Sequence, residues 1–509
     1  MLDLAFRADR ARPEPVYRQL EDFLRELIAT RRLASGERLP STRDLARDLG
    51  LSRNTVNLAF EALAEDGLLH SHVGRGTFVA GDAAPAARPP LRSVGGRSVG
   101  VHSAERARRG FAWGGLFARR TRAVKFPDSF HGATPPEPRF DFRGGQVDLG
   151  TLPRAELKAA FSRALSRDLP ELADAVDPRG WPPLREAIAR SLVARGIQCD
   201  ADEVAVVNGA QQALDLVARV LVDPGDTVAM EQPGYFGGAL AFSASEGHLV
   251  GVGVDAEGMR TDELARLLRA RRVKLVYTTP AVQSPTGVVM SDARRRHLLA
   301  LADEYQVPLV EDDYDSELRY GRPPVPALKN LDEAGQVIYV GTFSKALFAG
   351  LRVGYAVAAR PLIRRLVLSR WASDFNTDVV TQAALAQLLA SGGLERHVRR
   401  QRRLYTARRE ALLAALADRM PEGTRWIEPA GGNAVWVTLP AGSDGRAVCA
   451  AARERGIAYA TGDLFFLDGS GHEHLSLCFG RVEAERMDEG IRELAALVKR
   501  QKARARRSA

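Results

Sequence analysis

A lysine preceded by a serine and followed seven residues later by an arginine marks the segment 341–354, which reads Gly-Thr-Phe-Ser-Lys-Ala-Leu-Phe-Ala-Gly-Leu-Arg-Val-Gly. A lysine amine can form a Schiff base with a carbonyl group when neighbouring cations favour loss of its proton. Ser344 and Arg352 offer a hydroxyl and a guanidinium, which are donors suited to a phosphate. The spacing therefore indicates that Lys345 binds a carbonyl ligand that also carries a phosphate.

Three further segments offer groups that such a ligand needs. Ala210 and Gln211 follow an apolar strand and open a helix, whose first amides can hold a phosphate. The acidic run 311–313 also follows an apolar strand, and a carboxylate there can keep a pyridine nitrogen protonated while Tyr314 reaches a ring hydroxyl. Tyr235 offers an aromatic face for stacking. Since ligands bind at the carboxyl ends of parallel strands, the segments together predict a pyridoxal 5′-phosphate site.

These motifs, in this order, resemble fold-type I aminotransferases. The resemblance implies that Lys345 forms the Schiff base with the cofactor and that Asp312, in preference to Asp313, pairs with the pyridinium nitrogen. It implies that Tyr235 stacks on the ring and that Tyr314 contacts the ring hydroxyl. The full set of cofactor contacts that it implies is Ala210, Gln211, Tyr235, Asp312, Tyr314, Ser344, Lys345 and Arg352.

Two positions depart from the aminotransferase pattern. The loop 279–287 has Ser284 where aminotransferases usually have an asparagine, and the segment 474–479 has Ser476 where they have an arginine that grips the substrate's carboxylate. Arg481 is close in sequence, but it would have to point inward from a different position. Loss of a bidentate carboxylate contact removes binding and orientation. Ordinary transamination of amino acids is therefore doubtful, or the ligand is not a standard amino acid.

The pattern of the first 80 residues predicts a DNA-binding domain. Ser41 and Ser52 look like N-caps of two short helices, and residues 68–79 read as two strands joined by a glycine-rich turn. A helix-turn-helix places its second helix in the major groove, where the first residues of that helix reach base edges. We expect the following residues to contact DNA: Arg38, Ser41, Arg43, Ser52, Arg53, Asn54, Thr55, Asn57, Gly74, Arg75 and Gly76.

The sequence of these first 80 residues closely resembles the winged helix-turn-helix of GntR-type bacterial regulators. The matching runs are Arg-Leu-Pro-Ser-Thr-Arg at 38–43, Ser-Arg-Asn-Thr-Val at 52–56 and Gly-Arg-Gly-Thr-Phe-Val at 74–79. Together with the second half, the chain resembles the MocR-type subfamily. That resemblance implies a head-to-tail homodimer.

The elements that must position these residues follow from the alternation of apolar runs and helical patterns. We expect a winged helix-turn-helix at 1–80, a basic flexible linker at 81–139, and an aminotransferase-like domain at 140–509 with a small α+β subdomain at about 400–500. The large domain is expected to be α/β with a mostly parallel sheet. Its predicted strands are Val204–Val207, Thr227–Met230, Leu249–Val254, Leu275–Thr278, Pro308–Glu311, Val337–Gly341 and Gly354–Ala358.

Composition narrows the class of protein. The chain has 509 residues and a net charge of +9, with 45% hydrophobic and 27% charged residues, which is typical of globular domains. About +7 of this charge lies in 81–130 and about +6 in 499–507. The net charge therefore does not by itself mark residues 1–80 as a DNA-binding domain. The two basic runs are either phosphate contacts or solvated linker and tail. We predict no metal site, no membrane span and no secretion signal, and hence a cytoplasmic protein.

The function that fits both halves is transcription regulation by a PLP-binding sensor. Its partners would be a double-stranded DNA operator and a small amine or amino-acid effector, and the effector would shift the affinity for DNA. The alternative is an active PLP-dependent aminotransferase with an appended DNA-binding head. A DNA-binding scaffold with a dead cofactor domain is a third reading. The residues name neither the effector nor the operator.

Overall fold

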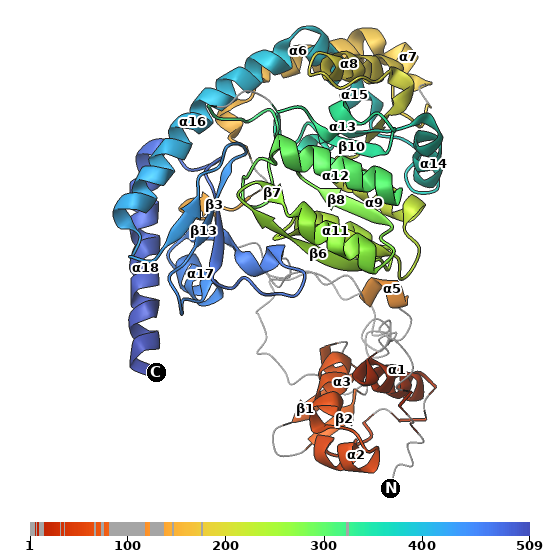
Figure 1. Ribbon diagram of the computed structural model, residues 1–509, viewed down its shortest axis with the longest axis vertical. Helices are drawn as coiled ribbons and strands as arrows, with labels where there is room; N and C mark the ends of the chain where they lie inside the picture. The colour runs from red at the N-terminus through yellow and green to blue at the C-terminus, as the bar shows by residue number, and fades with distance from the viewer. Residues whose placement is uncertain are drawn as a thin grey trace, which may run out of the picture. The chain divides into compact units, whose positions relative to one another are not determined.

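The computed structural model describes residues 6, 8–9, 15–30, 32–34, 36–65, 68–72, 76–80, 118–122, 137–144, 147–174, 177–321 and 325–508. The backbone divides into two compact units, one up to Arg122 and one from Ala123 onward. Each unit is described by itself (Figure 1). Most of the predicted linker, including 81–117 and 123–136, lies outside the described residues.

The first unit contains three helices and a pair of antiparallel strands. They are α1 (Val16–Ala29), α2 (Thr42–Asp48), α3 (Arg53–Glu65), β1 (Leu69–His72) and β2 (Gly76–Val79), and a short α5 (Arg119–Arg122) follows. Apolar residues at helical spacing form its core, among them Leu20, Leu24, Leu45, Val56, Phe60 and Leu63, with Leu69 and Val79 from the strands. The winged helix-turn-helix predicted from the sequence is thus the fold of this unit.

Serine caps begin the two helices of the motif. The Ser41 hydroxyl accepts a hydrogen bond from the Asp44 amide at 3.1 Å, and the Ser52 hydroxyl accepts one from the Thr55 amide at 3.0 Å. Such a cap satisfies an amide that the helix leaves without a partner. The two caps therefore fix the residues at which α2 and α3 begin.

The second unit is built on an eight-stranded sheet in the order β4-β11-β10-β9-β8-β5-β6-β7. Its strands are β4 (Val204–Val207), β5 (Thr227–Gln232), β6 (His248–Asp255), β7 (Gly258–Met259), β8 (Leu275–Thr278), β9 (Leu309–Asp313), β10 (Val337–Thr342) and β11 (Gly354–Val357). The five strands from β10 to β6 in this order are parallel, while β11 runs antiparallel to both β10 and β4. The predicted strands are all present.

Strand β9 is longer than the sequence indicated. We expected it to end at Glu311, with the acidic residues in the loop that follows, but the pairing with β10 continues through Asp312 and Asp313. The reason is that Val340 and Gly341 of β10 lie beside the acidic run and pair with Asp312 and Asp313. Asp312 therefore projects from the sheet itself.

Helices cover both faces of this sheet, as expected for an α/β domain. One face packs against α9 (Ala210–Leu221), α10 (Phe236–Ala244) and α14 (Arg360–Trp371). The other packs against α8 (Pro182–Val193), α11 (Thr261–Ala270), α12 (Asp292–Tyr305) and α15 (Val379–Ala390). Shorter elements join them: η3 (Leu149–Thr151), α6 (Arg154–Arg163), a π-helical turn (Ala164–Asp168), α7 (Leu169–Ala173), η5 (Ala201–Glu203), α13 (Leu328–Leu331) and η6 (Ala349–Leu351).

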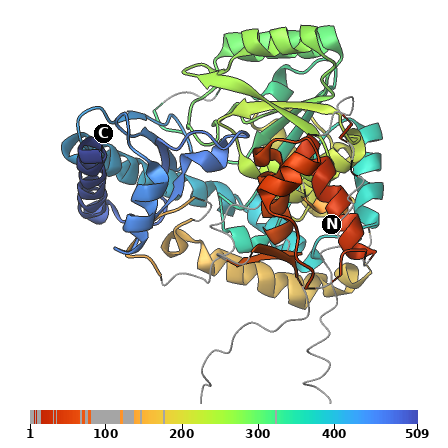
Figure 2. The same ribbon diagram turned by 90° about the horizontal axis from the view of Figure 1, so that it is seen from below.

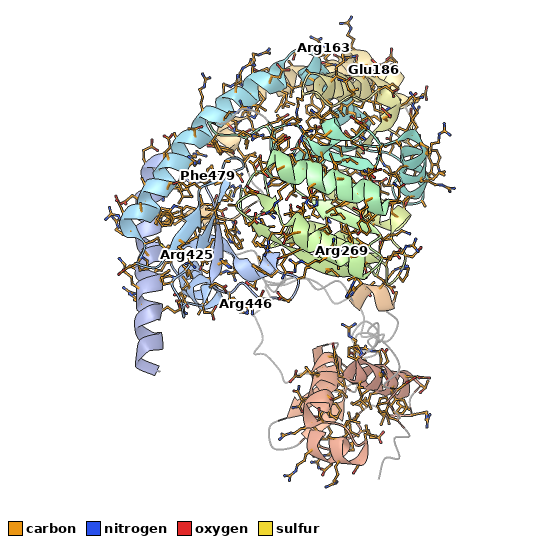
Figure 3. All side chains as sticks on the ribbon, in the orientation of Figure 1. Arg163, Glu186, Arg269, Arg425, Arg446 and Phe479 are labelled. Atoms are coloured by element: carbon orange, nitrogen blue, oxygen red, sulfur yellow. The ribbon has the colours of Figure 1, made fainter. Side chains whose placement is uncertain are left out.

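The smaller sheet has the order β12-β13-β15-β14-β3. Its elements are β12 (Arg425–Ile427), β13 (Ala434–Thr438), α17 (Gly445–Arg453), β14 (Ile457–Thr461), η7 (Gly462–Phe465), β15 (His474–Cys478) and η8 (Ala484–Arg486). The long α16 (Gly393–Arg419) runs from the helices beside the large sheet to this smaller one, where it packs beside α18 (Met487–Ser508) (Figures 1 and 2). Phe479 lies in the core between them (Figure 3).

One strand of the smaller sheet comes from the beginning of the unit. Strand β3 (Phe140–Phe142) pairs in parallel with β14, and both of its phenylalanines are fully buried. No strand was expected here, because three residues are too short for a periodic signal. The subdomain placed at about 400–500 therefore includes a segment from residue 140 as well.

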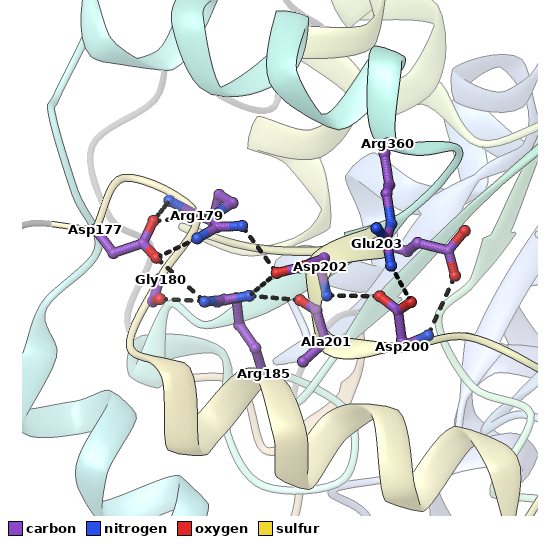
Figure 4. A network of polar contacts seen from close by, with 9 residues as sticks. All are labelled: Asp177, Arg179, Gly180, Arg185, Asp200, Ala201, Asp202, Glu203 and Arg360. Atoms are coloured by element: carbon purple, nitrogen blue, oxygen red, sulfur yellow. Dashed lines mark hydrogen bonds and ion pairs between the residues drawn. The ribbon is translucent and has the colours of Figure 1, made fainter.

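A polar network fixes the entry into β4. Arg185 of α8 donates to the carbonyl oxygens of Gly180 and Ala201 and pairs with Asp177 at 3.1 Å (Figure 4). Asp200 caps the turn before β4 and pairs with Arg360 of α14. Arg185 is buried, so its full set of acceptors offsets the cost of removing its charge from water. The network ties the turn before β4 to α8 and α14.

No helix of the described chain is both long enough and apolar enough to cross a membrane.

Candidate functional site

The predicted cofactor residues converge at one edge of the large sheet. The parallel strands β5, β8, β9 and β10 end at this edge, and the segments that follow them carry Tyr235, Ser284, Tyr314 and Lys345. At Gly354, the backbone of β11 lies very close to the end of β10 and to the start of α9. A Cβ placed on it would lie 2.8 Å from the carbonyl oxygen of Gly341 and 3.0 Å from the amide nitrogen of Ala210. The loop of Lys345 and the start of α9 are therefore in contact.

The start of α9 is shaped to hold an anion. Gly209 precedes the helix with φ +82°, a backbone conformation that residues with a Cβ rarely adopt. The guanidinium of Arg352 lies over it and donates to the carbonyl oxygen of Asn208 at 2.8 Å. Arg352 is itself left-handed, with φ +53°. A cation and the positive end of a helix dipole thus meet at Ala210 and Gln211, as a phosphate requires.

Asp312 is buried beneath this cradle. Its Oδ2 accepts the hydroxyl proton of Tyr277 at 2.8 Å, while its Oδ1 is buried and has no hydrogen-bond partner among the described residues. Burial raises the pKa of Asp312 to about 7, although the Tyr277 hydroxyl and the field of Lys345 act to lower it. A buried acceptor without a donor is costly. The protonated nitrogen of a pyridinium ring is a donor that would satisfy it, so the residues present fit pyridoxal phosphate.

Asp313, the second carboxylate considered for that role, has structural partners. It pairs with Arg195 at 2.8 Å and accepts from the Ser316 hydroxyl at 2.7 Å and from the Tyr339 hydroxyl. Successive residues of a strand point to opposite faces, so Asp313 is directed away from Asp312. The geometry favours Asp312 over Asp313 for contact with a ring nitrogen.

Tyr235 and Gln211 lie side by side at the cradle. A Cβ on Gly237 would come within 2.4 Å of the Tyr235 ring and 2.5 Å of the Gln211 amide oxygen. Gln211 donates from its side chain to the Gly237 carbonyl at 2.7 Å. Burial raises the pKa of Tyr235 to about 12, so its ring is a neutral face. The missing Cβ of Gly237 allows both side chains their positions.

Lys345 is half-buried and faces Tyr314. Its ammonium nitrogen lies 5.9 Å from the centre of the Tyr314 ring, and its backbone carbonyl accepts from Gln401 of α16 at 3.2 Å. Burial raises the pKa of Tyr314 well above its ordinary value, and a hydrogen bond with Ser284 opposes that effect. Ser344 is held by its neighbour, because its amide and hydroxyl both contact the Thr342 hydroxyl.

Several residues of the site could not be recognised from the sequence. Glu231 is fully buried and accepts from the Thr278 hydroxyl at 2.6 Å, the Thr279 hydroxyl at 2.7 Å and the Gln283 amide at 3.2 Å. It fixes the loop that carries Ser284. Asp374 accepts from the Gln212 side chain at 2.5 Å and so anchors the first turn of α9. These contacts join segments far apart in the chain, and no local pattern announces them.

Ser476, expected in the place of the aminotransferase arginine, lies in the strand β15. It is buried in β15, directly opposite Trp436 of β13. Arg481, the alternative cation, is turned to Asp141, which it meets at 3.0 Å and which also binds Arg143 at 2.8 Å. Among the described residues, no cluster of His, Cys, Asp and Glu could hold a metal ion.

In the first unit, the start of α3 presents polar side chains to solvent. Arg53 and Asn54 are exposed, and Thr55 and Asn57 are half-buried. Arg38 and Arg43 are exposed as well, on the segments before and within α2. Gly76 approaches Arg38 so closely that a Cβ on it would lie 2.9 Å from the Arg38 side chain. Gly74 and Arg75, predicted to be in the wing, lie outside the described residues.

Sequence profiles match both units. The profile of bacterial regulatory proteins of the gntR family matches residues 16–79, and that of class I and II aminotransferases matches residues 141–494. The chain is 32% identical to the probable rhizopine catabolism regulatory protein MocR of Rhizobium meliloti, over 96% of this chain and 94% of that protein. The chain belongs to the MocR-type regulators of the GntR family.

Enzymes are similar to the second unit alone. Aromatic-amino-acid aminotransferase 1 of Thermococcus litoralis is 38% identical over 63% of this chain and 78% of that protein. The crystal structure of an alpha-aminoadipate aminotransferase from Thermus thermophilus, complexed with N-(5′-phosphopyridoxyl)-L-leucine, superposes with a TM-score of 0.72 at 32% identity, covering 77% of this chain and 99% of that one. The family and fold expected from the sequence are thereby confirmed, and the cofactor of this fold family is pyridoxal 5′-phosphate.

Proposed function

We propose that this regulator reports the occupancy of the Lys345 site to its DNA-binding head. The observation that carries the proposal is the unpartnered, buried Oδ1 of Asp312 below the cradle of Gly209 and Arg352. The chain carries a DNA-binding unit as well as a cofactor site, and a role in sensing accounts for both. A ligand that binds one conformation of the protein better than another shifts the population toward that conformation.

Each residue has a separate part in holding the cofactor. Lys345 would bind its aldehyde carbon covalently, Asp312 would accept from the ring nitrogen, and Tyr314 would donate toward the ring hydroxyl. Tyr235 would cover one ring face. The phosphate would be held by the amides of Ala210 and Gln211, the Ser344 hydroxyl and the Arg352 guanidinium. When bound, the cofactor supplies an electrophilic carbon that captures amines.

The DNA contacts belong to the first unit. Arg53, Asn54, Thr55 and Asn57 at the start of α3 would enter the major groove, and Arg38 and Arg43 would contact phosphates. Gly76 would let the wing approach the backbone, together with Gly74 and Arg75. Ser41 and Ser52, which cap α2 and α3, would contact phosphates through their exposed edges. Because the operator is part of the bacterial chromosome, we place this regulator in the cytoplasm.

We also propose a homodimer of the second units. Leu368, Trp371 and Phe375 are large apolar residues exposed by 62%, 48% and 63% on one stretch of the second unit. Contiguous apolar surface of this kind marks an interface. A two-fold dimer would present two heads to two half-sites of an operator. The head-to-tail order is an expectation from the family resemblance.

The competing function is steady transamination, and one experiment separates the two. Full-length protein is loaded with pyridoxal phosphate, reduced with borohydride and digested, and DNA affinity is measured in parallel on duplex from upstream of its own gene. We expect the cofactor on Lys345, and we expect Lys345→Ala to lose it and to lose the cofactor's effect on DNA affinity. Lys158→Ala, an exposed lysine of α6, is the matched control. Rapid turnover of amine and keto acid with DNA affinity unmoved by the cofactor would favour the enzyme.

A further inference from the structure

The face of the smaller sheet that carries Ser476 is turned toward the Lys345 site. Residues paired directly across antiparallel strands share one face, so Trp436, Ser476 and Ala460 lie together. The residues between them, such as Val435 and Leu477, point to the opposite face and fill the core under α16 and α18. The shared face is therefore the one free to line the site.

Contacts with the large sheet place that face beside the cofactor residues. The Trp436 ring lies 5.5 Å from the ring of Phe465, edge to face, and the Phe465 carbonyl accepts from the Gly234 amide at 2.8 Å. Gly234 immediately precedes Tyr235. On the same strand as Ser476, burial raises the pKa of Cys478 to about 11, and the fields of Lys345 and Asp315 both reach its thiol. Trp436 is thus linked through Phe465 to the segment of Tyr235, and the strand of Ser476 comes within the field of Lys345 at Cys478.

The guanidinium groups near this face are already committed to partners in the protein. Arg481 and Arg143 both bind Asp141. Arg408 binds Asp148 and the Gly480 carbonyl, as the bonds at 2.5 Å each show. Two more donate to backbone carbonyls: Arg402 to Glu317 and Arg409 to Pro429. A ligand carboxylate that paired with any of these five arginines would have to compete with a partner in the protein.

A carboxylate of the protein is, in contrast, left without a partner. Asp315 is 4% exposed, and neither of its side-chain oxygens has a hydrogen-bond partner among the described residues. It lies between the two sheets, since a Cβ on Gly432 would be 3.4 Å from its Oδ2 and the field of Lys345 acts on it. Burial raises the pKa of Asp315 to about 7, and a cation placed beside it would favour the ionised carboxylate and be attracted, whereas a second anion would gain nothing there.

We propose that the effector sensed at Lys345 is a primary amine that lacks a carboxylate and carries a second cationic group, a diamine being the simplest case. One amine would face Lys345, and the second ammonium would lie toward Asp315, where its donors would satisfy the buried carboxylate. Trp436 would cover the carbon chain between them. This inference rests on the proposed function, because it names the ligand of the same site.

Two pairs of compounds that differ only in the α-carboxylate provide the test: cadaverine against L-lysine, and putrescine against L-ornithine. Each is titrated into full-length protein loaded with pyridoxal phosphate. The visible absorption, the heat of binding and the affinity for duplex from upstream of the chain's own gene are followed. We expect each diamine to bind at least about tenfold more tightly than its amino acid, because it would gain one charge-assisted contact that the amino acid's carboxylate opposes.

Three variants assign the preference to residues. Asp315→Asn should weaken cadaverine about tenfold and leave n-pentylamine, which has no second charge, unchanged. Ser476→Arg should raise the affinity for L-lysine, and it answers the question even if Asp315→Asn folds poorly. Arg481→Gln should change none of these affinities, because its partner is Asp141.

The outcomes separate this inference from the function beneath it. If L-lysine binds as tightly as cadaverine and moves DNA affinity as much, the sensing function stands and the diamine inference is overturned. Loss of L-lysine binding in Arg481→Gln would overturn it as well, since Arg481 would then be the missing clamp. If no amine changes the absorption or the DNA affinity, the diamine inference fails. The proposed function fails only if bound pyridoxal phosphate also leaves the affinity for DNA unchanged.

Discussion

One oxygen of Asp312 accepts the hydroxyl proton of Tyr277, and the other is buried without a partner in the described structure. Asp312→Asn keeps the shape and removes the charge. We expect it to weaken pyridoxal phosphate binding by about 10- to 100-fold, the value of a charge-assisted hydrogen bond. Equilibrium dialysis of cofactor from the full chain measures this.

Asp313→Asn is the matched comparison. Its carboxylate pairs with Arg195 at 2.8 Å, so we expect loss of stability with little change in cofactor affinity. Removal of one member of a buried pair leaves an uncompensated charge. If the two variants lost cofactor to the same extent, Asp312 would have no special part in binding it.

The same carboxyl group makes the cofactor-free protein sensitive to pH. Burial raises the pKa of Asp312 to about 7, from 3.8 in an exposed group. A folded state with the higher pKa holds more protons, so stability from this group is present below about pH 4 and is lost as pH rises to about 7. The upper bound is about 4 kcal/mol for a shift of about three units.

Thermal unfolding of cofactor-free wild type and Asp312→Asn at pH 5 and pH 8 isolates this contribution. We expect the wild type to lose more stability than the variant between the two values, since only the wild type must ionise the buried acid. Equal losses in both proteins would show that Asp312 is solvated. Bound cofactor should remove the difference, because the ring nitrogen then pairs with the carboxylate.

Lys345, Ser344 and Arg352 could be found from the sequence because they lie in the one loop between β10 and β11. Tyr277 could not, since it meets Asp312 only because β8 and β9 are neighbours in the sheet. Asp315 could not be singled out either. Its lack of a partner depends on how Gly432, more than a hundred residues away, closes over it.

Among the elements, the turn into α9 holds the conformation that the phosphate cradle needs. Gly209 has φ +82° and lies under Arg352, so a Cβ there would be 3.2 Å from the guanidinium. We expect Gly209→Ala to lower the affinity for pyridoxal phosphate at least about tenfold, since the cost of strain is about 1–3 kcal/mol and it falls on the binding loop.

Gly442→Ala controls for backbone strain alone. Gly442 has φ +80° and no atom within 4 Å of an added Cβ. It should lose stability and keep its cofactor affinity, which dialysis and thermal unfolding measure together. A cofactor affinity equally reduced in both variants would mean that Gly209 acts through stability only.

Helix α3 should carry the sequence preference for DNA. Asn54 is exposed at its start, so Asn54→Ala should cost about 1–3 kcal/mol on the operator and less on unrelated duplex. Glu61→Ala, exposed farther along the same helix, should leave the ratio of the two affinities unchanged. Fluorescence anisotropy at fixed salt gives both. If Asn54→Ala left this ratio unchanged, residues other than Asn54 would have to recognise the bases.

The helices and strands were largely predictable, because apolar periodicity and caps are local. The exceptions are informative. Strand β3 has three residues and exists only through its pairing with β14, and β9 gains Asp312 and Asp313 only because β10 continues beside it. In both cases a distant strand, and no local preference, supplies the backbone partners.

At the level of the whole chain, regulation requires that the Lys345 site and the DNA-binding site be coupled. Linkage requires the coupling to be reciprocal: an amine that changes DNA affinity by some factor must have its own affinity changed by DNA by the same factor. Neither unit by itself shows this property, and the sequence could not show it either, because it is a difference between states of the full protein.

The decisive measurement is therefore a pair of titrations on the loaded full-length protein. Cadaverine is titrated with and without saturating operator duplex, and duplex is titrated with and without saturating cadaverine. We predict equal fold-changes in the two dissociation constants, of about 5-fold or more, and no change in either for Lys345→Ala. Identical dissociation constants with and without the second ligand in the wild type would contradict the proposal that a diamine at the Lys345 site controls DNA binding.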